Sequence, residues 1–595
     1  MVITKSTLLR LKAATSRSDI ADILDIDLKN LTYLLYKQQD SEKYTSFNIN
    51  KKNGGVREIS APSKPLKSLQ SKTATLLQNC LLDIEISTGN INSSSHGFRP
   101  EKSIFTNASR HRNKRFVLNL DLKDFFPTIT FPRIRGFLIQ DKYFSLHKNI
   151  ATILAQIACL DSKLPQGSPC SPVISNMIAG ILDLHLSKLA KSNNCTYTRY
   201  ADDITFSTNK RDFPKSLAFS DPQMPHEWKL GRQLLGLIKK CGFCVNESKT
   251  RLQYKTSRQQ VTGLVVNKKV NVPAEYRHLV RAYVHSLVNT GAFTTKVATK
   301  TGDEKIIVEN VLGSNNQLHG MLGFIHATDS VYRTNLERHS YNYPGIKIDE
   351  KKPTGSLAIY RRFLLYTLFY ANNKPLVVCE GKTDNVYLSN AIHQNKKICP
   401  SLLTKNDDGK DVLALQFFKY ARKHSKKNHV YLPNFSTAKI LGNGSGGGPN
   451  LAGLITTYNK ESKKFNSPSG DHPVIFVVDN DSGGQPVFAA IKKISGINVT
   501  GKESFIHVFR NLYVVPIPLT DKKTATIEDL FSDADKGKIV DGKPFDFSKD
   551  ADEKVTAGKA SFAYDFVAKK PEEIDFSRFE PLLITLSDVI ADHKK

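Results

Sequence analysis

Apolar residues recur at helical spacing along the first forty residues of the chain. A spacing of three and four positions places such side chains on one face of a helix. The pattern therefore predicts a run of short amphipathic helices. Their apolar faces are carried by Leu8, Leu9, Leu11, Ile20, Ile23, Leu24, Leu31, Leu34 and Leu35.

A β-hairpin is expected directly after these helices. Lys51 to Gly55 contains an Asn-Gly pair, which suits a tight turn with positive φ. Val56 to Ile59 would form the return strand. Between Val117 and Phe206 the pattern runs strand, helix, helix, strand, as in a mixed α/β layer.

The middle of the chain is predicted to be helical again and to end in a linker. Helical spacing dominates from Tyr276 to about Ile325. Residues 338–355 are rich in Tyr, Asn, Pro, Gly and charged side chains, which is typical of a linker. An amphipathic helix from Leu357 to Tyr370 is expected to join this linker to the last part of the chain.

From residue 375 onward the pattern predicts a parallel sheet. Leu376 to Cys379 and Val474 to Val478 are short apolar runs of the kind that form strands buried on both faces. Residues 442–448 are glycine-rich but lack the Lys-Ser/Thr ending of a phosphate-binding loop, so we interpret them as a mobile loop. We divide this multidomain α/β chain into residues 1–250, 251–337, 338–374 and 375–595.

Charge and cysteine content narrow the function classes. The chain has 85 Lys+Arg and 56 Asp+Glu, a surplus of 85 − 56 = +29, which favours a phosphate backbone as partner. Its eight cysteines are too sparse for a disulfide framework, and we interpret Cys241 and Cys244 as reduced core thiols. The sequence shows neither a secretory signal nor a membrane span, so we expect a cytoplasmic setting without a membrane partner.

Three aspartates form a first candidate site. Asp121 ends an apolar strand, and Asp202-Asp203 follows 81 residues later (202 − 121) between two β-favouring arms. Such arms predict a hairpin with acids at its apex. Adjacent carboxylates repel one another unless a cation lies between them, and Mg²⁺ prefers oxygen ligands. Two such ions can activate a 3′-hydroxyl and stabilise leaving pyrophosphate.

Four motifs around these aspartates resemble those of reverse transcriptases. Tyr200-Ala201-Asp202-Asp203 is similar to their Y-x-D-D motif, and residues 121–126 (DLKDFF) resemble their first palm motif. Residues 165–172 (PQGSPCSP) and 246–250 (NESKT) resemble two further motifs, in the family's order. The resemblance implies a right-hand polymerase, with fingers and palm in residues 1–250 and a thumb in residues 251–337.

The same resemblance implies roles for individual residues. Asp121, Asp202 and Asp203 would hold two Mg²⁺ ions, and Lys249 would be the general acid that protonates pyrophosphate. Asp124 is left outside the metal set. Deoxynucleotide substrates would be bound by Phe126 as a steric gate against the ribose 2′-hydroxyl, by Gln166 and Gly167 beside the nascent pair, and by Arg57 on the triphosphate; the alternative for Arg57 is an ordinary surface arginine.

Further motifs resemble those of bacterial retron reverse transcriptases. They are His96-Gly97-Phe98-Arg99, residues 51–57 (KKNGGVR) and residues 261–267 (VTGLVVN). The resemblance implies a cognate structured noncoding RNA that is copied into a branched, RNA-linked single-stranded DNA (msDNA). An intron-derived or diversity-generating reverse transcriptase is the alternative. Basic thumb residues are expected to contact RNA as a group, namely Lys268, Lys269, Arg277 and Arg281.

A second group of acids follows the predicted parallel strands. Glu380 and Asp479 each end a strand, 99 residues apart (479 − 380), where open α/β sheets place their ligands. Together with Asp481 they resemble the acids of the TOPRIM fold in topoisomerases, primases and OLD-type nucleases. Asp384 and Glu528 resemble further acids of OLD-like members, with a first-turn helix acid as the alternative for Asp384.

This resemblance implies a Rossmann-like TOPRIM domain with one or two Mg²⁺ ions in residues 375–595. We expect it to cleave DNA or RNA as a toxic effector in antiphage defence. The alternative is a module that binds nucleic acid without cutting it. The target nucleic acid and the formation of a homo-oligomer are left open.

Overall fold

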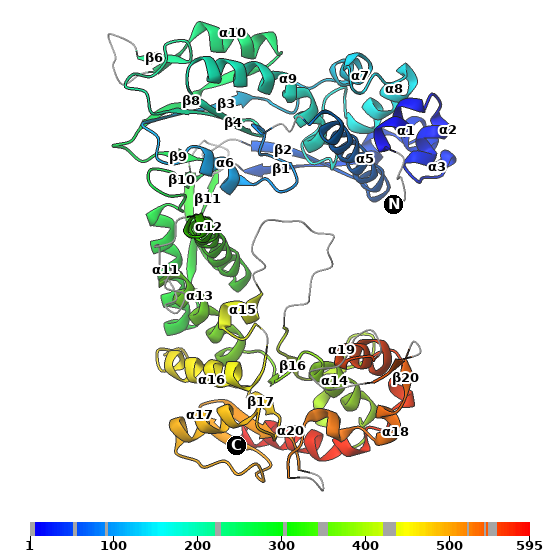
Figure 1. Cartoon of the computed structure of the whole chain (residues 1–595), viewed down its shortest axis with the longest axis vertical. Coiled ribbons are helices and arrows are strands. Elements are labelled where there is room, and N and C mark those ends of the chain that lie inside the picture. The colour runs from blue at the N-terminus through cyan, green and yellow to red at the C-terminus, as the bar shows by residue number, and fades with distance from the viewer. Residues whose placement is uncertain are drawn as a thin grey trace.

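The computed structural model describes residues 6–50, 56–89, 93–220, 228–300, 306–342, 355–420, 436–444, 446–519, 523–540, 543–545 and 556–595. Two bodies are joined by a column of thumb helices, and the ribbon has the outline of a bracket (Figure 1). The N-terminal body is drawn in blue to green, and the C-terminal body is drawn in yellow-green to red.

The N-terminal region is helical, as its apolar spacing predicts. Helices α1 (Thr7–Ala13), α2 (Arg17–Ile23) and α3 (Leu28–Tyr36) bury their apolar faces against the long helix α5 (Lys64–Thr88) and α8 (Lys148–Ala158). Strands β1 (Tyr44–Asn50) and β2 (Val56–Pro62) form the expected antiparallel hairpin. Its Asn-Gly turn at residues 51–55 lies outside the described residues.

A four-stranded antiparallel sheet, in the order β4-β5-β3-β8, lies in the region that the sequence predicts to be the palm. Its strands are β3 (Phe116–Lys123), β4 (Thr196–Tyr200), β5 (Asp203–Thr208) and β8 (Cys244–Tyr254). Helices α6 (Ile104–Arg110), α7 (Phe131–Gln140), α9 (Ser171–Ser192) and α10 (Arg232–Lys240) complete the region. Strand β3 is buried along nearly its whole length, because α9 and the flanking strands cover it.

Two features of the palm bear on the sequence interpretation. Helix α9 is, among the described residues, the one helix apolar and long enough to cross a membrane, but 61% of its apolar window is buried in the palm core. All eight cysteines are free thiols. Cys241 is partly buried, whereas Cys244 is exposed at the start of β8, so the prediction of a core thiol is wrong for Cys244.

The thumb contains a hairpin that the helical pattern did not predict. Helix α11 (Ala274–Thr290) is followed by strands β11 (Thr294–Lys300) and β12 (Ile306–Leu312), and then by α12 (Asn315–Asn342). The continuous helical region expected from Tyr276 to Ile325 is therefore wrong over residues 291–312. Gly291 ends α11 with φ +81°, a conformation that glycine adopts without strain.

Helix α13 (Gly355–Leu365) and the π-helix η1 (Tyr366–Tyr370) match the helix expected from 357 to 370. Residues 338–342 of the expected linker continue α12, and residues 343–354 lie outside the described residues. Tyr360 and Phe363 are buried at 4% and 2% exposure in a core that also contains thumb residues and residues of the C-terminal sheet. Thumb and C-terminal region thus share one hydrophobic core.

A five-stranded sheet organises the C-terminal region, in the order β16-β13-β17-β19-β18. Strands β16 (Gln416–Phe417), β13 (Leu376–Cys379), β17 (Val474–Val478) and β19 (Leu512–Pro516) are parallel, and β18 (Ile506–Phe509) is antiparallel. The predicted parallel pairing of β13 and β17 is confirmed. Alternate residues of each strand enter separate cores, so both sheet faces are covered.

Helices cover both faces of this sheet. They are α14 (Asp384–Gln394), α15 (Thr437–Leu441), α16 (Gly448–Ser462), α17 (Gln485–Ser495), α18 (Asp533–Lys536), α19 (Lys559–Ser561) and α20 (Glu580–Asp592). Short elements between them include η3 (Ile527–Leu530), the π-helix η4 (Phe562–Val567) and the hairpin of β14 (Leu403–Lys405) with β15 (Asp411–Leu413).

Candidate active sites

The palm sheet brings the three predicted aspartates together. Asp121 near the end of β3 lies directly opposite Asp203, the first residue of β5. The β4–β5 turn places Asp202 beside them, and its carbonyl accepts a hydrogen bond from Leu122 N at 3.0 Å. The hairpin with acids at its apex is therefore present, and it is bonded to the strand that carries the third acid.

The carboxylates of this palm site repel one another. Burial and the charge of Asp121 raise the pKa of Asp202. Burial, then the charges of Asp202 and Asp121, raise the pKa of Asp203 to about 7. Lys249 Nζ faces both oxygens of Asp121 at 3.0 and 3.1 Å. The clustered carboxylate oxygens of these three aspartates, beside which Lys249 lies, are ligands of the kind that Mg²⁺ prefers.

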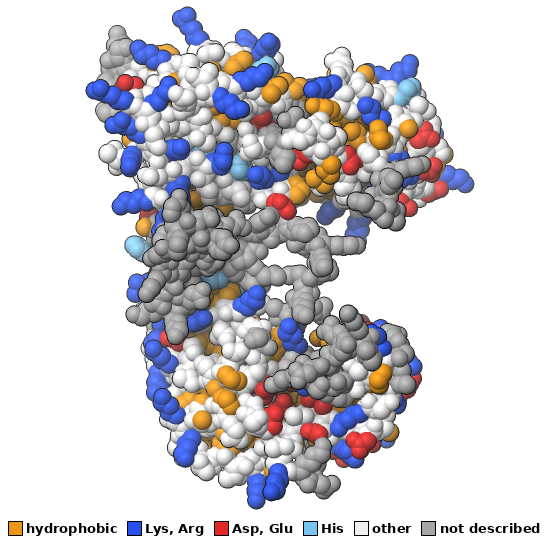
Figure 2. All heavy atoms as spheres, in the orientation of Figure 1, with side chains coloured by type: hydrophobic (Ala, Val, Ile, Leu, Met, Phe, Trp, Pro, Cys, Tyr) orange, Lys and Arg blue, Asp and Glu red, His pale blue; other side chains and the backbone are white. Residues whose placement is uncertain are grey.

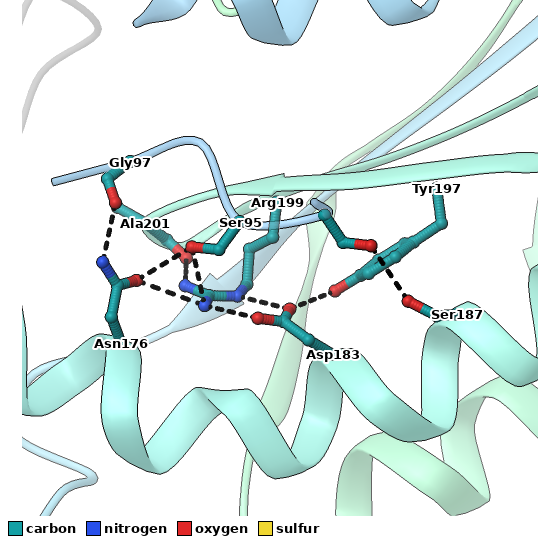
Figure 3. A network of polar contacts seen from close by, with 9 residues as sticks. Ser95, Gly97, Asn176, Asp183, Ser187, Tyr197, Arg199 and Ala201 are labelled. Carbon is teal, nitrogen blue, oxygen red and sulfur yellow. Dashed lines mark hydrogen bonds and ion pairs between the residues drawn. The ribbon is translucent and has the colours of Figure 1, made fainter. Parts of the chain in front are cut away.

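A buried network beneath the β4–β5 turn holds the turn in place (Figure 3). Arg199, fully buried on β4, makes a bidentate ion pair with Asp183 of α9, with Nε and Nη2 both 2.8 Å from its oxygens. Its Nη1 donates to the Ala201 carbonyl at 3.0 Å. Ala201 needs this support, because its φ of +55° is unusual for a residue with a side chain.

We expect Arg199→Ala to destabilise the N-terminal body strongly. The substitution removes the cationic partner of the Asp183 carboxylate, which is buried at 2% exposure, and the loss of such a partner costs about 3–5 kcal/mol. Urea denaturation followed by circular dichroism measures the loss. Arg115→Ala, at an exposed position near the same sheet, is the control. An unfolding midpoint equal to that of the control would show that the network does not stabilise the palm.

Two glycines of the predicted motifs stand where another side chain would collide with the backbone. A Cβ on Gly97 would lie 2.5 Å from Ala201 N, so the His-Gly-Phe segment packs directly against the aspartate turn. Gly167 has φ +124°, and a Cβ there would lie 2.6 Å from Ser60 O. Ser60 N also donates to Gln166 O at 2.8 Å, which attaches this motif to the fingers hairpin.

The remaining palm residues lie at the edge of the same site. Phe126 is partly buried, and its ring packs against Phe98 with centroids 6.3 Å apart. Phe98 in turn contacts Tyr200 of the aspartate turn at 6.5 Å. Arg57 is exposed on β2, yet its charge lowers the pKa of Asp202, against the larger effects of burial and Asp121. The structure thus places Phe126 and Arg57 around the aspartates.

The basic thumb residues do not behave as one group. Arg277 is tied to Asp329 and Asn271, with Nη1 3.1 Å from Asp329 Oδ2. Lys268, Lys269 and Arg281 are exposed. Because Asp329 neutralises the charge of Arg277, this arginine is less suited to contact RNA than Lys268, Lys269 and Arg281 are.

The C-terminal sheet brings the second set of predicted acids to one edge. Glu380 directly follows β13 and Asp479 directly follows β17, and these strands are parallel neighbours. Glu380 accepts from Asp479 N at 3.4 Å, and Asp479 Oδ1 accepts from Ile527 N at 3.1 Å. The latter contact brings η3, which carries Glu528, to the site.

The other two acids are held by turns at the same edge. Asp384, 6% exposed, accepts from Gly381 N at 2.6 Å, and Asp481 accepts from Gly483 N at 2.7 Å. A Cβ built on Gly483 would lie 3.0 Å from Asp481 Oδ1 and 3.4 Å from Glu380 Oε1. Asp481 and Glu380 therefore face the same small volume.

The glycine-rich segment is part of this edge. Gly448 N donates to Glu380 Oε1 at 2.9 Å, and Gly447 N donates to Glu380 O at 3.1 Å. A Cβ on Gly446 would lie 2.4 Å from Glu380 O. The segment that the sequence analysis interprets as a mobile loop thus contacts the predicted site, and glycine at these positions allows its backbone to approach Glu380.

Burial and mutual repulsion raise the pKa values of the acids at this edge. Burial, then Asp384, Glu380 and Glu528, raise the pKa of Asp479 to about 8, and burial with Glu528 raises that of Asp384 to about 6. Glu380 also has a raised pKa, caused first by burial. Unfavourable charge of this kind is what a bound divalent cation offsets.

Sequence reasoning missed Lys559. Its Nζ lies 2.9 Å from Glu528 Oε1, and although burial alone would lower its pKa, Glu528, Asp479 and Asp384 raise it. No motif marks this lysine, since it lies 31 residues beyond Glu528 (559 − 528) on a short helix. Within the described residues no three His, Cys, Asp or Glu side chains already lie at metal-ligand spacing, so the fit to Mg²⁺ rests on this acidic donor set.

We expect the stability of the protein in EDTA to fall as pH rises from about 4 to about 8. The folded pKa of Asp479, about 8, exceeds its unfolded value of about 3.9, so the folded state holds a proton that the unfolded state releases. The difference in melting temperature between Asp479→Asn and wild type should therefore grow by several °C toward pH 8.5, at about 2–4 °C per kcal/mol. Differential scanning calorimetry measures it. If the melting temperatures of the two proteins changed with pH by the same amount, the expectation would be contradicted.

Comparison with known proteins gives an independent reading of the N-terminal body. A family model described as reverse transcriptase (RNA-dependent DNA polymerase) matches residues 49–266. The retron Mx162 reverse transcriptase of Myxococcus xanthus is 32% identical over 340 residues, covering 53% of this chain and 64% of the relative. The retron Mx65 enzyme of the same organism is 33% identical over 287 residues, covering 45% and 62%.

A third relative is matched over more of its length. The retron Ec86 reverse transcriptase of Escherichia coli is 32% identical over 272 residues, covering 45% of this chain and 77% of the relative. The chain spans a little under two thirds of the length of the two Myxococcus relatives. Telomerase from Candida albicans matches among solved structures over 54% of this chain and 59% of that chain, but its TM-score of 0.29 and 10% identity carry no argument.

Proposed function

This chain belongs to the retron reverse transcriptases, and we propose from that premise that it is an RNA-directed DNA polymerase that copies a cognate structured noncoding RNA into msDNA. The observation that carries the proposal is the convergence of Asp121, Asp202 and Asp203 at one end of the palm sheet. These residues would hold two Mg²⁺ ions, which would activate the primer hydroxyl and stabilise leaving pyrophosphate. Lys249, already beside Asp121, is placed to supply the proton to pyrophosphate.

The distribution of charge supports a nucleic-acid partner. Lysine and arginine side chains are spread over the visible face of the N-terminal body (Figure 2). The chain as a whole carries a net charge of +29. Phosphate binding by such a surface releases counterions, so we expect RNA affinity to fall steeply as salt is added.

Extraction of nucleic acid from the protein tests the polymerase proposal. The full chain is expressed with its native flanking DNA, and the bound nucleic acid is run on a denaturing gel before and after RNase treatment. We expect single-stranded DNA that shortens only by its RNA branch. Unbranched DNA would favour the intron-like alternative, and no DNA from a folded, dNTP-binding protein would contradict the polymerase role.

For the C-terminal region we propose a metal-dependent TOPRIM nuclease that acts as a cytoplasmic effector in antiphage defence. The proposal is supported by Glu380 and Asp479 at the carboxyl ends of neighbouring parallel strands, with Asp384, Asp481 and Glu528 around them. Their donor set would hold one or two Mg²⁺ ions, which supply Lewis-acid chemistry at a phosphodiester. Lys559 would balance the charge of Glu528 beside them.

Defence measurements test the effector role. Cells that carry the full chain and its flanking RNA are challenged with a panel of phages, and plaque formation is compared with that of cells carrying Glu380→Gln. Restored plaque formation in the variant would support the effector role. Equal protection by both proteins would show that defence does not depend on this acidic edge.

A further inference from the structure

A cavity of about 440 Å³ lies between the thumb and the helix that leads into the C-terminal sheet. Its volume falls in the range of about 300–1,000 Å³ typical of small-molecule sites. It is separate from both carboxylate sites, because the lining residues that the structure describes belong to the helices α11, α12 and α13. Neither proposed activity uses it.

The interior of this cavity is apolar. Val280 of α11 and Leu322 and Ile325 of α12 line it and are buried at 1%, 3% and 4% exposure. Ala358 and Ile359 of α13 line the facing wall. An apolar part of a ligand would therefore contact aliphatic side chains from all three helices.

The charged residues that line the cavity in the described part of the chain are basic, namely Arg277, His278, Arg281 and Arg362, and Ser356 is a further polar lining residue. Arg277 is neutralised by Asp329. Arg281 forms no ion pair with any described residue, and Arg362 uses only its Nε on Glu461, so its two Nη groups have no partner in the described part of the chain. Guanidinium groups with spare N–H donors suit a phosphate.

We propose that this cavity binds a nucleoside phosphate, with the phosphate between Arg281 of α11 and Arg362 of α13 and the base against Val280 and Ile359. The two arginines belong to different helices, so the bound ligand braces the thumb against α13. Helix α13 continues through η1 toward β13, whose end carries Glu380. The site thus connects thumb position to the acidic edge. Its ligand is a free nucleotide or the 5′-phosphorylated end of a strand.

Isothermal titration calorimetry of the full chain tests the proposal, in EDTA and after removal of co-purifying nucleic acid. The probes are deoxyadenosine monophosphate, a 5′-phosphorylated hexadeoxynucleotide and its 5′-hydroxyl counterpart. We expect Arg281→Ala to weaken binding at least about tenfold, the loss expected for a charge-assisted contact. Arg258→Ala is the matched control, because Arg258 is an exposed thumb arginine outside the lining.

The outcomes test whether the cavity binds a nucleoside phosphate and whether that phosphate comes from a free nucleotide or from a strand end. Binding of the mononucleotide that Arg281→Ala weakens supports a free nucleotide, whereas binding of the 5′-phosphorylated strand alone supports a strand end. Ala358→Phe, which fills the cavity, should abolish either one without lowering the melting temperature. Absence of binding in the wild type, or unchanged binding in Arg281→Ala and Ala358→Phe, would overturn the proposal. The measurement requires neither enzymatic activity, so it is independent of the proposed function.

Discussion

Asp203→Asn is expected to reduce DNA synthesis at least about 1,000-fold. Asp203 lies opposite Asp121 in the palm sheet, and burial together with the charges of Asp202 and Asp121 raises its pKa. An amide in its place removes a charged oxygen donor from the proposed Mg²⁺ site. The loss of several kcal/mol of transition-state stabilisation corresponds to three or more powers of ten in rate. Primer extension with a defined RNA template and labelled dNTPs measures it.

The control for this substitution is Asp212→Asn, which changes an exposed aspartate near the same sheet. It should polymerise at the wild-type rate. Asp203→Asn should also keep its fold, since removing one of three repelling carboxylates relieves unfavourable charge. A variant that melts at or above the wild-type temperature yet extends primers within tenfold of the wild-type rate would show that Asp203 is not a metal-holding residue.

The second large effect is expected at the acidic edge of the C-terminal sheet. Asp479→Asn or Glu380→Gln should abolish Mg²⁺-dependent cleavage of nucleic acid, by at least about 1,000-fold, and leave primer extension unchanged. Burial and neighbouring carboxylates raise the pKa values of Asp479 and Glu380, so both side chains belong to the acidic cluster that would hold the metal. Labelled single-stranded and double-stranded DNA and RNA serve as substrates in one assay.

Asp588→Asn is the matched control, because Asp588 is exposed on α20 away from this edge. It should cleave at the wild-type rate. Wild-type protein that binds these substrates without cutting any of them would favour the nucleic-acid-binding module instead. Cleavage that persists in both Asp479→Asn and Glu380→Gln would place the nuclease activity elsewhere in the chain.

Local patterns were enough to predict the strands that carry both sets of acids. Val117 to Leu120 and Val474 to Val478 are largely apolar runs that each lead into an aspartate, and each run forms a buried strand, β3 in the first sheet and β17 in the second. The pairing of Glu380 with Asp479 follows from strand direction, because carboxyl ends of adjacent parallel strands meet at one edge. These parts of the fold depend on short stretches of sequence.

Features that depend on partners distant in sequence were not predictable. Arg277 looks like a solvent-facing thumb arginine until α12 brings Asp329 to it, and Lys559 has no motif that connects it to Glu528. Strands β11 and β12 pair with each other where helical spacing was expected to continue, because Gly291 ends α11. In each case the structure depends on tertiary contacts, which the spacing of residues along the chain does not reveal.

The core shared by the thumb and the C-terminal sheet limits how such a chain can be recombined. Tyr360 and Phe363 are enclosed by α11 and α12 on one side and by α15 and α16 on the other. A gene exchange with its junction at residue 375 would separate partners that fill one another's apolar surfaces. A C-terminal region exchanged between related chains would therefore have to bring helices α11, α12 and α13 with it to keep this core intact.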